Sequence, residues 1–120
     1  MQPDTTKGGG LSESRRVAWL AEELGARFIP HGWNTAVGLA ADLHLASALP
    51  YTDLVEYKTG SAYIDELTVE GFALDDDGLL AVPDRPGLGI HLDTDALDRY
   101  ASSPACWMAD RTRGTTIRGD

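Results

Sequence analysis

The chain has 120 residues, of which 42% are hydrophobic, and a net charge of −9; this is typical of one small globular domain with a modest core. The acidic balance argues against nucleic-acid binding, because phosphates attract basic surfaces, and no stretch approaches the ~18 consecutive apolar residues of a membrane span. The single cysteine, Cys106, excludes an internal disulfide and a cysteine-based zinc site, and residues 1–10 lack the apolar middle of a signal peptide, so we expect a cytoplasmic protein.

The first predicted elements are a helix and a short strand. Ser12 is a suitable N-cap, and Gly25 supplies a stop. Between them, apolar residues recur at helical spacing at Val17, Leu20 and Leu24. Residues 27–29 follow as a candidate strand.

A second helix and strand repeat this order. The helix is predicted from Asn34 or Thr35 to about Ala48, and it is apolar on most faces, which indicates a buried helix. Pro50 ends it, and residues 53–57 read as another short strand. Two strands, each preceded by a helix, indicate an α/β fold with parallel strands.

The pattern changes after residue 57. Residues 58–100 are rich in turn signals such as Asp77-Gly78 and Pro86-Gly87, and their only strong helix signal is at 95–100. A short extended piece is expected at 79–82. The last residues have no useful periodicity, and we expect 104–120 to be a disordered tail.

Three candidate acid/base groups follow apolar or proline residues in the same local context. Asp4 follows Gln2-Pro3, His31 follows Ile29-Pro30, and Glu56 follows Leu54-Val55. Side chains at the carboxyl ends of parallel strands meet at one edge, and the 27-residue spacing of Asp4 and His31 suits adjacent strands. A carboxylate that binds one imidazole nitrogen fixes the tautomer and makes the other nitrogen a general acid/base.

Each of these signals has an ordinary explanation when taken alone. A histidine after a proline is more often a surface residue, a glutamate in LVEY more often the polar end of a strand, and an aspartate near a chain start more often a cap. The shared position at strand ends favours the functional interpretation.

The exact residues of four stretches are more informative than their hydrophobic pattern alone. QPDTTKGGGLSESRRVAWLAEELG, FIPHGWNTAVGLAADLHLASALP, DLVEY and DDDGLLAVPDRPGLGIHLD together cover residues 2 to about 100. In order and spacing they resemble the C-terminal part of the mandelate racemase/muconate lactonizing enzyme group of the enolase superfamily. The resemblance implies a partial TIM-like (β/α)7β barrel in residues 1–57, with the last strands and helices. It implies a segment at 58–103 that returns to a capping domain.

The resemblance also implies roles for the three groups. Asp4 matches the aspartate that ends the sixth strand, His31 matches the histidine that ends the seventh, and the two form a dyad. Glu56 matches the eighth-strand acid that hydrogen-bonds the substrate carboxylate in its enolate form. Trp33 is a candidate substrate-binding wall, although an aromatic residue in a loop is at least as often plain packing. The implied reaction removes the proton next to a carboxylate, most simply in a sugar-acid dehydratase; a racemase or cycloisomerase is the alternative.

The implied cofactor is Mg²⁺, but its ligands lie on family strands that would precede Met1. Asp75, Asp76 and Asp77 sit in a turn and are expected to solvate it rather than bind metal. The chain therefore looks like the last third of an enzyme that acts on a sugar acid or another carboxylate, and we expect it to be inactive without the missing N-terminal portion. A non-catalytic remnant, or an interaction module that pairs with another chain or with its own copies, is the other interpretation.

Overall fold

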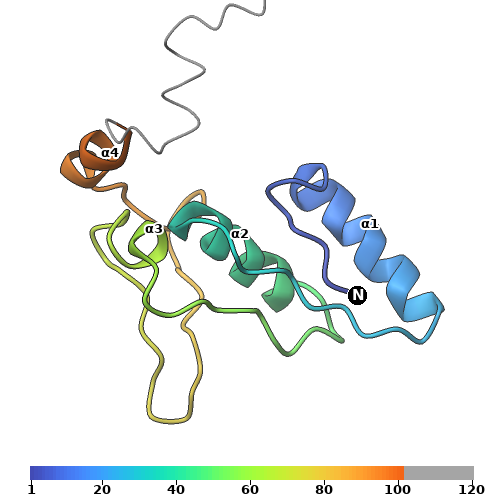
Figure 1. The fold of residues 1–120 in the computed structure, drawn as a ribbon. Coiled ribbons are helices and arrows are strands. Elements are labelled where there is room, and N and C mark those ends of the chain that lie inside the picture. The colour runs from blue at the N-terminus through green and yellow to red at the C-terminus, as the bar shows by residue number, and fades with distance from the viewer. Residues whose placement is uncertain (102–120) are drawn as a thin grey trace, which may run out of the picture.

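The computed structural model describes residues 1–101, which form four helices joined by extended segments and turns (Figure 1). They are α1 (Gly10–Glu23), α2 (Ala36–Ser47), α3 (Ala62–Asp65) and α4 (Thr94–Ala101). None of these helices is long and apolar enough to cross a membrane. The tail predicted at 104–120 lies outside the described residues.

Helix α1 begins three residues earlier than an N-cap at Ser12 predicted, because its N-cap is Gly9. The loop before it winds tightly, because the amides of Gly8 and Gly10 donate to the carbonyls of Asp4 (2.7 Å) and Thr5 (3.1 Å). Gly9, with φ 98°, adopts the left-handed conformation that this turn needs and becomes the N-cap. At the other end Gly25, with φ 66°, stops the helix as predicted.

Helix α2 lies at the centre of the molecule, beside α1 (Figure 1). Most of its residues are buried, as its apolar sequence predicts, and it contributes to three separate apolar clusters. Leu45 packs with Phe28 and the inner face of α1, Leu39 and Leu43 pack on Ile64, and Ala36 packs on Leu67. The helix thus joins the two halves of the chain.

The strands predicted at 27–29 and 53–57 are extended, but neither they nor any other segment of residues 1–101 forms a regular strand. The amides of Ile29 and His31 donate to the carbonyls of Met1 and Pro3, both at 3.0 Å, and the amide of Glu56 donates to the carbonyl of Pro30 at 3.3 Å. The three segments therefore run parallel with few bonds each. Pro3 and Pro30 lack the amides that a longer ladder needs.

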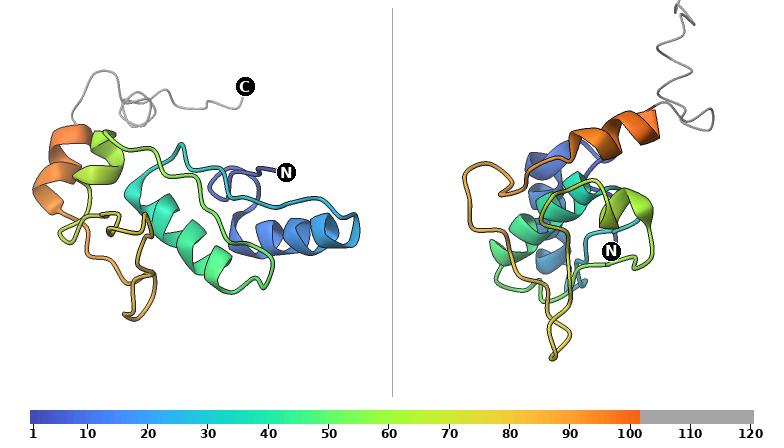
Figure 2. Two further views of the ribbon diagram at one scale, coloured as in Figure 1. Left: turned by 90° about the horizontal axis from the view of Figure 1, so that it is seen from below. Right: turned by 90° about the vertical axis from the view of Figure 1, so that its left-hand side faces the viewer.

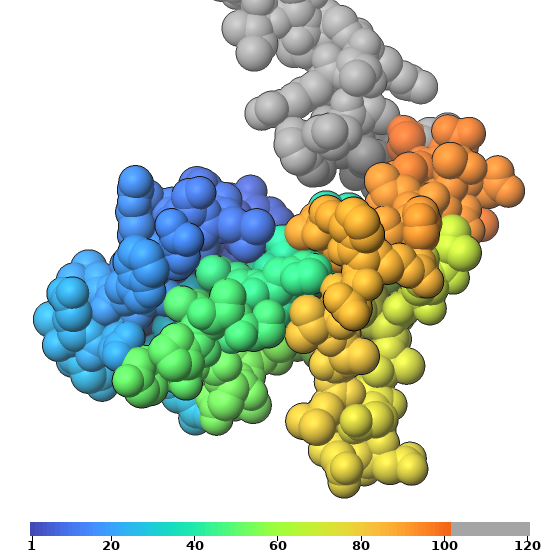
Figure 3. All heavy atoms as spheres, turned by 180° about the vertical axis from the view of Figure 1, so that it is seen from behind, coloured from blue at the N-terminus to red at the C-terminus, as the bar shows by residue number. Residues whose placement is uncertain are grey.

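The rest of the described chain packs against the far end of α2. Helix α3 was not predicted, because the sequence has no helical periodicity there. It lies beside α4 (Figure 2), and the ring centroids of Tyr63 and Tyr100 are 5.2 Å apart. Antiparallel bridges pair Thr68 with Leu92 and Leu74 with Leu80. The second bridge closes a hairpin that includes the extended piece expected at 79–82 and stands out from the body (Figure 3).

Candidate functional site

The parallel pairing brings the three predicted residues to one edge. His31 Nδ1 lies 3.4 Å from Asp4 Oδ2, and His31 Nε2 lies 3.9 Å from Glu56 Oε2. The imidazole is about one-third exposed (34%), whereas the Asp4 side chain is 13% exposed. One imidazole thus sits between two carboxylates, with its Nε2 edge towards the solvent-accessible Glu56.

The contact between Asp4 and His31 is not yet a hydrogen bond. Nδ1 of His31 is buried and has no aligned partner, although Asp4 Oδ2 is close to it. The Asp4 carboxylate instead accepts bonds from the Thr6 amide (2.9 Å) and hydroxyl (2.5 Å) and from Lys7 Nζ (2.5 Å). Hydrogen bonds to catalytic groups are often long before substrate binds, so the pair is positioned for the contact without making it.

The same bonds fix the charge of Asp4. Burial opposes ionisation of the carboxyl group, but the hydrogen bonds from Lys7 and Thr6 outweigh it and lower the pKa of Asp4 to about 2. Asp4 is therefore a carboxylate at neutral pH. It can orient an N–H at Nδ1 of His31 and stabilise a charged imidazolium there.

Glu56 is held beside His31 by the backbone of Gly32. The Gly32 amide donates to Glu56 Oε2 at 3.2 Å. A Cβ at position 32 would lie 1.6 Å from the Glu56 carbonyl oxygen, so only glycine permits this approach. The glycine in the FIPHGWN stretch thus sets the distance between the two segments that carry His31 and Glu56.

A buried carboxyl group that the sequence did not single out ties the loops together from behind. Asp42, on α2, is fully buried and accepts bonds from the Thr5 hydroxyl and, at 3.2 Å, from Asn34 Nδ2. Asn34 Nδ2 also reaches the His31 carbonyl at 3.4 Å. The loops after Asp4 and His31 are thereby anchored to one helix side chain.

Trp33 and Lys58 form a pair beyond this trio. Trp33 is largely exposed (63%), and Lys58 Nζ lies 4.1 Å from the centroid of its ring. This is a cation–π contact. The ring at Trp33, the predicted substrate wall, is therefore largely exposed and contacts an ammonium group.

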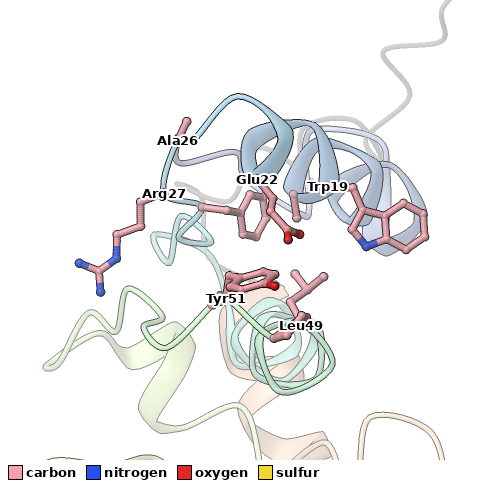
Figure 4. Close-up of a pocket in the computed structure, with 11 residues that line it drawn as sticks. Trp19, Glu22, Ala26, Arg27, Leu49 and Tyr51 are labelled. Carbon is pink, nitrogen blue, oxygen red and sulfur yellow. The ribbon is translucent and has the colours of Figure 1, made fainter.

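One cavity of the described residues lies away from this site. It has a volume of about 310 Å³ and lies between α1 and the loop that follows α2, where Trp19, Glu22 and Tyr51 line it (Figure 4). It adjoins residues 26–28 and 50–52, which lie at the amino-terminal ends of the extended segments. Because reacting groups of parallel α/β folds sit at the carboxyl ends of strands, we assign the site to the opposite end.

A second histidine–carboxylate pair lies in the 58–101 region. His91 Nδ1 is 2.6 Å from Glu70 Oε1, and Arg85 donates to the same oxygen. The hydrogen bonds from His91 and Arg85 lower the pKa of Glu70 to about 2. Both oxygens of Glu70 are engaged, since the His91 amide donates to the other at 3.1 Å. These contacts hold the segment that contains Glu70 against the segment that contains Arg85 and His91.

The described residues do not fit a magnesium site. No group of three or more histidine, cysteine, aspartate or glutamate side chains in residues 1–101 is arranged to hold a metal ion. The aspartates at 75–77 lie in the tip of the hairpin, where Asp75 Oδ1 accepts the amides of Asp77 (3.0 Å) and Leu79 (2.8 Å). The three aspartates lie in a turn, as the sequence predicted, and Asp75 stabilises it through these bonds.

The described residues form part of an α/β fold. At the carboxyl ends of its parallel segments, the imidazole of His31 lies between the carboxyl groups of Asp4 and Glu56. The chain belongs to the enolase C-terminal domain-like family, whose model matches residues 1–96. Its relatives and structural neighbours place it in the mandelate racemase/muconate lactonizing enzyme group of the enolase superfamily, which confirms the resemblance seen in the sequence.

Three relatives illustrate the match. A D-galactarolactone cycloisomerase from Agrobacterium fabrum is 33% identical over 109 residues, covering 83% of this chain and 29% of that protein. A D-xylonate dehydratase from Haloferax volcanii is 32% identical over 98 residues, covering 82% and 24%. The crystal structure of a 3,6-anhydro-D-galactonate cycloisomerase from Zobellia galactanivorans shares the fold, with a TM-score of 0.71 and 37% identity over 82% of this chain and 28% of that one. This chain spans less than a third of each of them.

Proposed function

We propose that this chain supplies the histidine acid/base of a sugar-acid dehydratase of the enolase superfamily. The observation that carries the proposal is the imidazole of His31, held 3.4 Å from one carboxylate and 3.9 Å from another at the carboxyl ends of adjacent parallel segments. Family membership supports it, because the relatives include enzymes named for the dehydration of sugar acids.

The finer architecture belongs to the same proposal. Residues 1–57 form the C-terminal part of a (β/α)7β barrel, and residues 58–103 return towards a capping domain. The one-sided bonding of the segments at 1–4 and 53–57 supports this, since each leaves backbone groups that a further strand would pair with. The missing portion of the protein is the expected partner, and it has to supply the Mg²⁺ ligands, because residues 1–101 do not.

The chemistry available to this chain is a proton transfer at His31 Nε2. With an N–H at Nδ1 facing Asp4, Nε2 carries the free lone pair and takes the proton from the carbon next to the substrate carboxylate. The C–H electron pair moves into the carboxylate as an enolate, which a hydrogen bond with the Glu56 side chain would stabilise. In dehydration the neighbouring hydroxyl leaves with a proton returned by the imidazolium, and the net change is the loss of one water.

A suitable experiment joins residues 1–101 to the rest of the Agrobacterium fabrum relative, in place of the region that this chain matches. We expect the hybrid to act on at least one of gluconate, galactonate, xylonate and rhamnonate, or to exchange their α-proton in D₂O. Changing His31 to Asn keeps the size but removes the proton shuttle, and should lower the rate at least about 100-fold. A folded hybrid without exchange or turnover, or an unaffected His31→Asn variant, would contradict the proposal.

Cycloisomerisation is a second candidate, favoured by two of the similar proteins that bear that name. It starts with the same proton abstraction but ends with a product of unchanged mass. Mass spectrometry of the product separates the two reactions, because dehydration removes the mass of one water. Retention of mass with a new ring pattern by NMR would favour the cycloisomerase over the dehydratase.

A further inference from the structure

The charges around His31 raise a question about how an acid substrate is held. Asp4 is ionised at neutral pH, and Glu56 presents a second carboxyl group at the same edge. The chain as a whole carries a net charge of −9. An anionic substrate that approaches this edge is therefore repelled unless nearby cations offset the charge.

Both lysines of the chain lie at this edge. Lys7 follows Asp4 by three residues, and Lys58 follows Glu56 by two. Lys7 Nζ is committed to Asp4 Oδ2 at 2.5 Å. Lys58 makes no salt bridge within residues 1–101; its ammonium group rests on the ring of Trp33. Lys58 is therefore the cation at this edge that remains available to a ligand.

The backbone pairing fixes where this cation stands. Residues two apart on an extended segment project on the same side, so Trp33 follows His31 and Lys58 follows Glu56 on the side of the site. The two segments are in register, because the Glu56 amide bonds to the carbonyl of Pro30. Two extended residues advance the chain about 6–7 Å. The Trp33–Lys58 pair therefore lies one side-chain layer outside the reacting groups.

This distance is comparable to the length of a sugar-acid carbon chain. A substrate with its carboxylate near Glu56 and its α-carbon near His31 would extend along the Trp33 ring and end at Lys58. An ammonium group that contacts a ring face keeps N–H donors for a further partner, and the best complement for such donors is an anion.

We propose that Lys58, positioned on Trp33, binds the far end of the substrate and selects sugar diacids over monoacids of the same length. The inference rests on the proposed function, because it uses the orientation of a carboxylate substrate in that site. It goes beyond it by naming the substrate class and the residue pair that sets the preference.

The test is a binding experiment on the full 120-residue chain, so it does not depend on turnover. The ¹⁵N-labelled chain is titrated at constant low ionic strength with galactarate, a diacid, and galactonate, the corresponding monoacid. The readout is the indole N–H signal of Trp33, assigned with a Trp33→Phe variant. One additional exposed ion pair corresponds to about a fivefold lower Kd for the diacid.

Three variants show whether Lys58 causes the difference. Lys58→Gln should abolish the preference for the diacid, whereas Lys58→Arg should retain it. Arg15→Gln is the matched control, because Arg15 also stacks on a tryptophan, Trp19, at 4.9 Å, but on α1. It should leave the preference unchanged.

Equal Kd values for the two acids, or no saturable response to either, would overturn the proposal. So would a diacid preference that survives Lys58→Gln or that Arg15→Gln removes equally. Failure of the proposed function is distinguishable, because it appears as a lack of proton exchange or turnover in the hybrid enzyme, whatever the isolated chain binds.

Discussion

At the scale of single residues, Asp42 is an ionisable group that the fold removes from water. Its carboxyl group is fully buried on α2, and burial raises the pKa of Asp42 although the bonds from Thr5 and Asn34 oppose that shift. The negative charge of Asp4 acts in the same direction as burial. A raised pKa means that the folded state holds this proton more tightly than the unfolded state does.

The sign of the pH dependence follows from this shift. Asp42 costs no stability below its unfolded pKa of about 3.8, and the cost appears as the pH rises and the buried group ionises. An Asp42→Asn variant avoids that ionisation. Its side-chain oxygen can still accept from Asn34 Nδ2, and its NH2 group can donate to the Thr5 hydroxyl oxygen. We expect the variant to gain stability relative to the natural chain between about pH 4 and 7.

Urea unfolding at several pH values measures this difference. Asp53→Asn is a control of opposite sign, because a hydrogen bond from Arg27 lowers the pKa of Asp53 and its contribution is present at neutral pH. A stability difference for Asp42→Asn that stays constant or shrinks as the pH rises would contradict a raised pKa of the Asp42 carboxyl group.

At the scale of elements, α2 is the structural centre, and Leu43 tests that role. Leu43 is buried (3% exposed) against Leu39 and Ile64. Leu43→Ala should reduce the free energy of unfolding by about 2–5 kcal/mol, since it removes buried methyl groups and leaves a cavity. Val37, on the same helix but exposed, is the matched control, and Val37→Ala should change stability by no more than about 0.5 kcal/mol. Comparable small losses in both variants would mean that α2 is not the core.

The elements also show what sequence patterns can predict. Helices α1 and α2 were predictable because apolar spacing and Gly25 are local signals. The start of α1 was not predicted, because it depends on backbone hydrogen bonds within the loop that follows Asp4. Helix α3 was not predicted, because four residues are too few to show a helical periodicity. The predicted strands are extended but irregular, since a ladder depends on neighbours that a local pattern does not contain.

The site divides in the same way. The sequence predicted that Asp4, His31 and Glu56 meet at one edge, because each follows an extended segment. The structure brings them together there. Their catalytic roles remain predictions. The bonds of Asp42 to Thr5 and of Lys7 to Asp4 were not foreseen. Thr5 and Asp42 are 37 residues apart, and only tertiary packing brings them together.

At the scale of the whole molecule, the described residues show the surface of an incomplete unit. Large apolar side chains such as Trp19, Tyr51 and Leu54 are exposed, although the core around α2 is well buried. The segments that carry Asp4 and Glu56 each have a backbone edge with few bonds. Exposed apolar patches and free edges favour association with further protein.

The last prediction concerns the full 120-residue chain without any other portion. It should bind Mg²⁺ no better than an ordinary acidic surface does, because its described carboxylates form no oxygen cage. The enolate formed by proton abstraction then lacks the several kcal/mol of charge stabilisation that a metal ion supplies, and a histidine base does not replace it. Calorimetry with Mg²⁺ should therefore show only weak, non-saturating heats, and α-proton exchange on the same sugar acids should not exceed the buffer rate. The hybrid enzyme provides the active reference under identical conditions. Turnover by the chain alone would overturn the view that its residues act only within a larger enzyme.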